Sequence, residues 1–79
     1  MSSLTKAHTA TATDVWFDDS KMTILLSDGR EVAIPIDWFP KLRDAIEVER
    51  NHWRLIGNGQ GIHWPDLDED ISVSGLLHG

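Results

Sequence analysis

The chain of 79 residues contains no cysteine. This excludes disulfide bonds and thiolate metal sites, and it indicates a reducing, cytoplasmic setting. No stretch of the sequence approaches the roughly 20 consecutive apolar residues of a membrane-spanning helix. The first residues, Met1–Lys6, also lack the apolar segment of a signal peptide. We therefore expect a small cytoplasmic protein that does not enter a membrane.

Positive charge is also scarce, because 7 basic residues stand against 13 acidic ones and the formal net charge is −6. Such a charge repels a phosphate backbone, so direct binding of nucleic acid is disfavoured. It suits either a solvated acidic surface or the attraction of a basic protein partner. The sequence does contain four tryptophans and two phenylalanines. Each aromatic side chain can bury on the order of 150–250 Å², which matters for a core in so short a chain.

Residues 1–11 are small and polar and predict a flexible leader whose end can join the first strand, whereas residues 12–79 predict a single α+β domain. The domain begins with a predicted hairpin of Thr13–Phe17 and Met22–Ser27, which turns at Asp19–Ser20. In this register Val15, Phe17, Met22 and Ile24 share one apolar face of the sheet.

The next connection, Ser27–Gly29, allows two registers. A two-residue turn at Asp28–Gly29 interrupts the apolar face, whereas a three-residue loop with Gly29 at positive φ places Ile24 opposite Val32 and keeps the face continuous. We favour the three-residue loop because the buried face sets the register. The third strand is then Arg30–Ile34, and Pro35 ends it.

A central helix is predicted to follow, with Asp37 as its N-cap and Pro40 in its first turn. Apolar residues at helical spacing predict one buried stripe, formed by Trp38, Leu42, Ala45 and Ile46. The sequence leaves open whether the helix continues through Arg50 or breaks near Ile46 and restarts.

A second hairpin is predicted from Trp53–Ile56 and Gly61–Trp64 around Asn58–Gly59, the dipeptide that most strongly favours a tight turn. Its register places Leu55 opposite Ile62 and makes Trp53 and Trp64 cross-strand neighbours.

Pro65 then ends the strand, and the residues up to Asp70 read as an acidic loop. Ser72 is predicted to cap a short last helix, Val73–Leu77, which Leu76 and Leu77 fasten to the core. The predicted fold is a small antiparallel sheet of two hairpins, with about five strands, packed on one central helix.

Four segments of the sequence carry a resemblance to a known family: Asp28–Arg30, Trp38–Leu42, Trp53–Asp70 and Ser72–Leu77. With these segments, roughly residues 12–79 resemble domain-of-unknown-function family 2442, a family of small bacterial proteins. The resemblance implies a compact α+β fold and no established activity. Genes of such proteins often lie beside genes of small basic proteins, in pairs that look like toxin–antitoxin modules, so the resemblance implies a partner of this kind. Relatives tend to have a threonine at position 46, which caps a second helix; this chain has Ile46.

The carboxylates Asp66, Asp68 and Asp70 alternate as in the start of a calcium-binding loop, but Leu77 stands where such a loop needs a bidentate glutamate. We therefore expect at least one of the three to accept backbone N–H groups instead. His63 with Asp66 and Asp68 forms an alternative polar site, for a small enzyme or a metal or ligand binder. No catalytic residue, metal site or cofactor is predicted.

The favoured hypothesis is a small acidic protein-interaction module, with a small basic, toxin-like protein as its partner. Trp16 and Leu25 lie on the second face of the predicted sheet, where a chain this small has little to cover them. The predicted interaction residues are Trp16, Leu25, Glu47, Glu49, Asp66, Asp68 and Glu69. Two alternatives remain: the small enzyme or ligand binder around His63, and a structural homodimer with no catalytic role.

Overall fold

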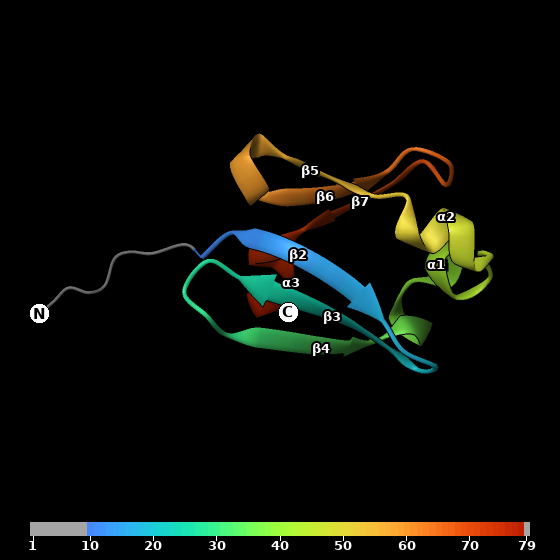
Figure 1. The fold of residues 1–79 in the computed structure, drawn as a ribbon, viewed down its shortest axis with the longest axis horizontal. Helices are drawn as coiled ribbons and strands as arrows, with labels where there is room; N and C mark the ends of the chain where they lie inside the picture. The colour runs from blue at the N-terminus through green and yellow to red at the C-terminus, as the bar shows by residue number, and fades with distance from the viewer. Residues whose placement is uncertain (1–9, 79) are drawn as a thin grey trace, which may run out of the picture.

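The computed structural model describes residues 10–78 and contains two separate three-stranded antiparallel sheets (Figure 1). The first sheet consists of β2 (Ala12–Phe17), β3 (Lys21–Leu26) and β4 (Glu31–Pro35) in that order. Short helical segments follow: η1 (Ile36–Trp38), α1 (Pro40–Arg43) and α2 (Glu47–Asn51). The second sheet consists of β5 (Arg54–Ile56), β6 (Gly61–Trp64) and β7 (Glu69–Ser72), with the turn η2 (Gly57–Gly59) after β5 and the helix α3 (Val73–His78) after β7.

The first sheet has the predicted registers. Val15 pairs with Ile24 in the β2–β3 hairpin, and Ile24 pairs with Val32 across the β3–β4 connection. Gly29 has a φ of +94°, and the N–H of Leu26 donates to the carbonyl oxygen of Arg30 at 2.8 Å. The connection is therefore the three-residue loop with its glycine in the left-handed region, and the apolar face is continuous as predicted.

The start of the first sheet is packed rather than loose. Ala10 is buried, the N–H of Thr11 donates to Ser27 Oγ at 3.1 Å, and the N–H of Ser27 donates to the carbonyl oxygen of Thr11 at 2.7 Å. Ala10 and Thr11, the end of the predicted leader, thus join the first sheet, as the sequence allowed. The rest of the predicted leader, residues 1–9, lies outside the described residues.

The predicted central helix is wrong. The segment instead forms η1, α1 and α2, with Phe39 in a non-helical conformation between η1 and α1 and Ile46 extended between α1 and α2. Asp37 caps no helix, and Trp38 and Ile46 are 59% and 64% exposed, so the predicted apolar stripe does not exist. Of its members, Leu42 is fully buried and Ala45 is half-buried.

The break at Ile46 occurs although isoleucine offers no side-chain acceptor for a cap. The Glu49 carboxylate accepts a hydrogen bond from the backbone N–H of Ile46 at 3.3 Å, which is one half of a capping box. In addition, the Arg50 guanidinium donates to the carbonyl oxygens of Leu42 and Arg43 at 2.8 and 2.9 Å. These bonds satisfy the C-terminal carbonyls of α1 and hold α2 against it.

The second hairpin has the predicted register, because Leu55 pairs with Ile62 and Arg54 with His63. β5 begins only at Arg54, so Trp53 lies just before the strand, and the aromatic partner of Trp64 is Phe17 on the first sheet. The chain turns at Asn58–Gly59 as predicted: both residues have positive φ, 59° and 89°, and the N–H of Gln60 donates to the carbonyl oxygen of Gly57 at 3.2 Å. Gly57–Gly59 forms η2.

The second half of the predicted acidic loop is a β-strand. After a turn at residues 65–68, Glu69–Ser72 forms β7, a third strand that pairs with β6 through Ile62–Ile71 and His63–Asp70. The predicted single sheet of about five strands on one central helix is therefore wrong. The observed fold is α+β with two separate sheets and little helix, because β7 completes a second sheet and no helix is long enough to form a layer.

The core lies between the two sheets. Val15, Met22 and Ile24 from the first sheet and Ile62, Trp64 and Ile71 from the second belong to one buried apolar cluster. The indole N–H of Trp64 donates to the carbonyl oxygen of Arg50 at 2.9 Å, which satisfies its polar atom. The arrangement leaves each sheet with one face inward and one face outward. None of the helices within residues 10–78 combines the length and the apolar character needed to cross a membrane.

The last helix has the predicted cap. Ser72 Oγ accepts a hydrogen bond from the backbone N–H of Gly75 at 3.3 Å. Leu76 and Leu77 pack against the buried cluster, as the sequence predicts. β7 runs directly into α3, so this cap lies where the chain leaves the second sheet (Figure 1).

Candidate functional site

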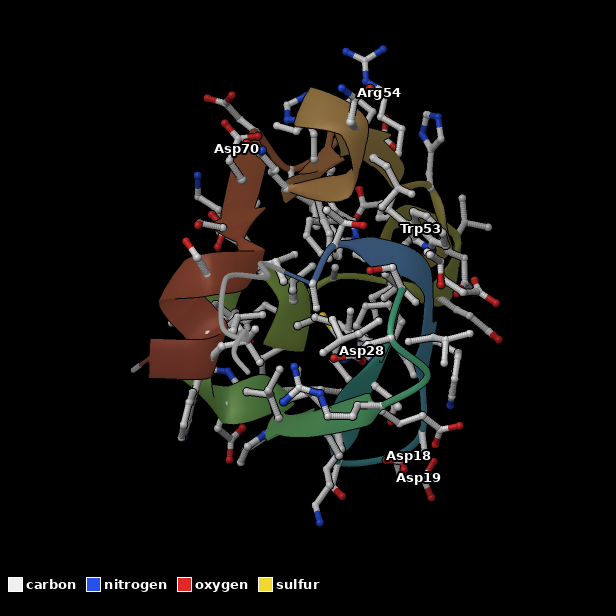
Figure 2. The ribbon with its side chains drawn as sticks, turned by 90° about the vertical axis from the view of Figure 1, so that its left-hand side faces the viewer. Asp18, Asp19, Asp28, Trp53, Arg54 and Asp70 are labelled. Carbon is white, nitrogen blue, oxygen red and sulfur yellow. The ribbon has the colours of Figure 1, made fainter. Side chains whose placement is uncertain are left out.

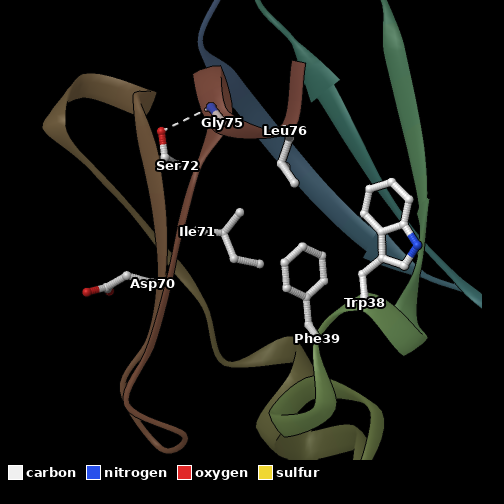
Figure 3. A pocket seen from close by; sticks show the side chains of 7 residues that line it. All are labelled: Trp38, Phe39, Asp70, Ile71, Ser72, Gly75 and Leu76. Atoms are coloured by element: carbon white, nitrogen blue, oxygen red, sulfur yellow. Dashed lines mark hydrogen bonds between the residues drawn. The ribbon is translucent and has the colours of Figure 1, made fainter. Parts of the chain in front are cut away.

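An open groove of about 510 Å³ lies beside β7 (Figure 3). Its lining residues come from β7, from α3 and from the junction between η1 and α1: Trp38, Phe39, Asp70, Ile71, Ser72, Gly75 and Leu76. Four of these side chains are large and apolar, so the groove can accept an apolar group. An open apolar groove with a few polar atoms at its rim is typical of a binding site.

The kink at Phe39 creates one wall of the groove. Phe39 has a φ of −127° and a ψ of 88°, which ends η1. Phe39 packs against the core, while Trp38 stays 59% exposed. Figure 3 shows Phe39 pointing toward Ile71, with Trp38 farther out on the same side. The groove therefore has a fixed apolar floor and an exposed tryptophan at its rim.

The other wall is β7, an edge strand that pairs with β6 alone among the strands of residues 10–78. A second hollow of about 320 Å³ lies along the same strand and is lined by Ile56, Gly57, Gln60, Gly61, Asp70, Ile71 and Ser72. Asp70, Ile71 and Ser72 line both hollows. Because Ile56 and Gly61 belong to β5 and β6, this second hollow lies over the paired strands of the second sheet, whereas the groove lies toward η1, α1 and α3.

The outward face of the second sheet carries a row of polar side chains, Arg54, His63 and Asp70, from three neighbouring strands. His63 Nδ1 is hydrogen-bonded to Asp70 Oδ1, with the histidine side chain only 20% exposed and the aspartate 68% exposed. Figure 2 shows Arg54 and Asp70 at the end of the molecule opposite Asp18 and Asp19. The histidine is thus fixed in the sheet, and the carboxylate stays open to solvent.

The alternative polar site does not assemble. His63 pairs with Asp70, whereas Asp66 Oδ2 pairs with His52 Nδ1 at 2.8 Å, and Asp68 takes no part in either pair. Within residues 10–78 no three histidine or acidic side chains come close enough to hold a metal ion. The hydrogen bonds therefore place His63 and Asp66 in two separate pairs rather than in one polar site.

The expected role of the acidic segment is also wrong. In the described part of the chain, none of the carboxylates of Asp66, Asp68 and Asp70 accepts a backbone N–H; two of them bond histidines instead. Backbone N–H groups are accepted by aspartates of the first sheet. The N–H groups of Ser20 and Lys21 lower the pKa of Asp18, and the N–H of Arg30 lowers that of Asp28. These aspartates hold turns and lie outside the groove.

The predicted interaction residues fall on three separate surfaces. Trp16 is 39% exposed and Leu25 is half-buried, both on the outward face of the first sheet. Glu47 lines a hollow of about 330 Å³ beside the β2–β3 turn, and Glu49 lies on the same helix, α2. The other predicted acids, Asp66, Asp68 and Glu69, lie in or directly after the turn between β6 and β7.

The groove residues Trp38, Phe39, Ile71 and Leu76 did not emerge from the sequence as a site. The helical spacing assigned Trp38 to the core, and β7 was hidden in what looked like a loop. One signal was available: Trp38 and Phe39 are adjacent aromatics directly before Pro40, and the residue before a proline is biased toward extended backbone.

Together, the fold and the groove define a small two-sheet α+β domain with an open apolar groove beside an edge strand. The chain belongs to the family described as protein of unknown function (DUF2442), which matches residues 12–79. The resemblance recognised in the sequence is thereby confirmed. None of the curated proteins is similar in sequence to the chain.

Two solved structures share the fold. A protein of unknown function from Rhodospirillum rubrum superposes with a TM-score of 0.79 at 27% identity, over 91% of this chain and 89% of that chain. An uncharacterized protein from Chromobacterium violaceum superposes with a TM-score of 0.73 at 23% identity, over 86% of this chain and 64% of that chain. Both similarities support the two-sheet fold. Both proteins are described without an activity, so the similarities indicate no function.

Proposed function

We propose that the protein is a small acidic protein-binding module whose partner docks in the groove beside β7. One observation carries the proposal: the groove combines a floor of Phe39 and Ile71 with the exposed indole of Trp38 at its rim. Exposed tryptophan beside an apolar pocket is a frequent centre of binding energy in protein interfaces.

The charge of the chain indicates the kind of partner. With a net charge of −6, the protein attracts a basic protein and repels an acidic one. Of the acids, Asp70 lines the groove, and three more precede it in the β6–β7 turn and β7: Asp66, Asp68 and Glu69. Glu47 and Glu49 on α2 add to the same long-range field. These carboxylates steer a basic partner toward the groove.

The partner class is a small basic protein of the toxin-like kind that the family resemblance implies, which makes this chain its antitoxin-like binder. The absence of cysteine fits a reducing, cytoplasmic setting for such a pair. No catalytic role is needed for this function, because an antitoxin-like binder acts by covering a surface of its partner.

The test is affinity capture of the basic partner from the source cell, followed by binding kinetics at two salt concentrations. Trp38→Ala should raise the dissociation rate, because it removes the exposed anchor of the groove. Trp16→Ala is the matched control on the outward face of the first sheet and should leave the rate unchanged. The association rate should fall as the screening length shortens from about 10 Å at 0.1 M salt to about 3 Å at 1 M.

Two results would contradict the proposal. If Trp16→Ala weakens binding and Trp38→Ala does not, the partner binds the outward face of the first sheet. If the association rate does not change with salt, the acidic charge has no part in steering.

A further inference from the structure

We propose that the partner binds by adding a strand to β7, through an extended segment that carries a basic residue next to a large apolar one. This inference rests on the function proposed above, and it specifies how the groove is used. When a peptide adds a strand to an exposed sheet edge, main-chain hydrogen bonds provide the affinity. The alternate side chains of the peptide provide the specificity.

The hydrogen bonding of the second sheet shows which backbone groups of β7 are open. The N–H of Val73 donates to the carbonyl oxygen of Gln60 at 2.9 Å. In an antiparallel ladder, hydrogen-bonded and non-hydrogen-bonded pairs alternate, so the His63–Asp70 and Gly61–Ser72 pairs are non-hydrogen-bonded. The N–H and C=O of Asp70 and the N–H of Ser72 therefore point away from β6, toward the free edge.

Each free edge of the first sheet lacks one of the donors that an added strand would need. On β2, the carboxylate of Asp14 accepts the N–H of Val15 at 2.8 Å, which occupies an edge donor. β4 ends in Pro35, which has no N–H to offer. On the approach to β7, Lys41 Nζ donates to the carbonyl oxygen of Asp68 at 3.1 Å. The open part of the edge is thus limited to Asp70–Ser72, so the added strand is short.

The groove and the exposed Asp70 carboxylate define which side chains the added strand must carry. A residue paired with Ile71 points to the inner face, into the groove of about 510 Å³ beside Phe39 and Leu76. A residue paired with Asp70 points to the outer face, beside a carboxylate that is 68% exposed. A large apolar residue fits the first position, and a lysine or arginine fits the second.

Charge also decides between a foreign strand and a second copy of this chain. Two copies of β7 side by side would bring the carboxylates of Glu69 and Asp70 close to those of the partner copy, and like charges on neighbouring strands are destabilising. A basic segment instead gains an opposite-charge pair at the same position. The occupant that the edge favours is therefore a basic, extended segment of another protein.

The test uses short synthetic peptides in which lysine alternates with phenylalanine and valine, and the full-length chain labelled for NMR. The lysine peptide should bind and slow amide hydrogen exchange at Asp70 and Ser72 on the order of tenfold or more, because their N–H groups gain partners. A peptide with glutamate in place of lysine should bind more weakly. A peptide with N-methyl groups on the backbone nitrogens that face β7 should also lose affinity, although its side chains are unchanged.

Two variants at one position separate backbone pairing from charge. Asp70→Ala removes the carboxylate and keeps the N–H, whereas Asp70→Pro removes both. Because the Asp70 N–H points away from β6, the proline leaves the ladder of the second sheet intact. The proline variant should bind about 2- to 10-fold more weakly than the alanine variant, the effect of one hydrogen bond. Thermal melting of both variants checks that they are folded.

Several outcomes would overturn strand addition. If the N-methylated peptide binds as well as its parent, or if the two Asp70 variants bind equally, main-chain pairing is absent. In that case loss of binding in Trp38→Ala still supports the groove as the docking site, so the proposed function survives. If the Asp70 and Ser72 amides are protected without peptide as protein concentration rises, the occupant is a second copy. If no peptide binds and Trp38→Ala does not weaken the captured complex, both proposals fail.

Discussion

The two sheets have the same three-stranded order, but their aspartates do different things. In the first sheet, Asp18 accepts hydrogen bonds from the N–H groups of Ser20 and Lys21 at 2.9 and 2.8 Å, and Asp28 accepts one from Arg30 at 3.0 Å. In the second sheet, Asp66 and Asp70 bond histidine side chains instead. The turns of the first sheet are therefore specified locally, within a few residues, whereas the second sheet depends on contacts between distant segments.

The contact between the sheets should show the largest effect of a single substitution. Trp64 is fully buried, its indole N–H donates to Arg50, and its ring meets Phe17 edge-on with centroids 6.5 Å apart. Trp64→Ala should lower the free energy of unfolding by about 3–5 kcal/mol, because it opens a cavity between the sheets. Trp38→Ala is the control and should cost far less, since this side chain is 59% exposed. Denaturant unfolding measures both, and equal losses would contradict a core centred on Trp64.

The next largest effect on stability is expected from substitutions at the two glycine turns. Gly29 and Gly59 both have positive φ, but a Cβ on Gly29 meets nothing within 4 Å, whereas one on Gly59 lies 2.6 Å from the carbonyl oxygen of Ala12. Gly29→Ala should cost about 1–2 kcal/mol for the left-handed backbone alone. Gly59→Ala should cost more, because η2 must also move away from the first sheet. If the two variants melt at the same temperature, the contact of η2 with β2 does not stabilise the fold.

The same contrast explains how much of the fold the sequence predicts. In the first sheet, alternating apolar residues and the Gly29 loop determine both registers, because each is set by neighbours in the chain. In the second sheet, the pairing of Leu55 with Ile62 is also predictable from alternation. β7 is not, because its four residues contain one apolar side chain, Ile71, and acidic residues disfavour strands. Only its pairing with β6 makes it a strand.

The central helix fails for a related reason. The spacing of Trp38, Leu42, Ala45 and Ile46 fits a helix, but the core has room for Phe39 and Leu42 from this segment and not for the other large side chains. Tertiary packing therefore overrides a local pattern. The candidate groove could not be predicted either. Its walls are the kink at Phe39, where a continuous helix was predicted, and the edge of β7, where a loop was predicted.

The pH dependence of stability should come more from the first sheet than from the groove. Backbone N–H groups hold the pKa of Asp18 below its ordinary value of 3.8. Because the folded-state pKa is lowered, this stabilisation is complete above pH 3.8 and is lost as the pH falls through the lowered value. Asp18→Asn should therefore reduce the difference in melting temperature between pH 7 and pH 3. An unchanged difference would mean that the turn at Asp18 carries no acid sensitivity.

The smallest effect on stability is expected for the aspartate–histidine pair next to the second sheet. Asp66 and His52 form an exposed pair, with 39% and 62% of their side chains accessible, and such pairs contribute about 0–1 kcal/mol. Asp66→Asn should therefore change the free energy of unfolding by less than about 1 kcal/mol. A larger loss, measured by denaturant unfolding, would mean that the β6–β7 turn is held as firmly by its aspartate as the β2–β3 turn is. A small loss leaves the carboxylates of this turn replaceable without unfolding, so their charge can be varied to measure steering of a partner alone.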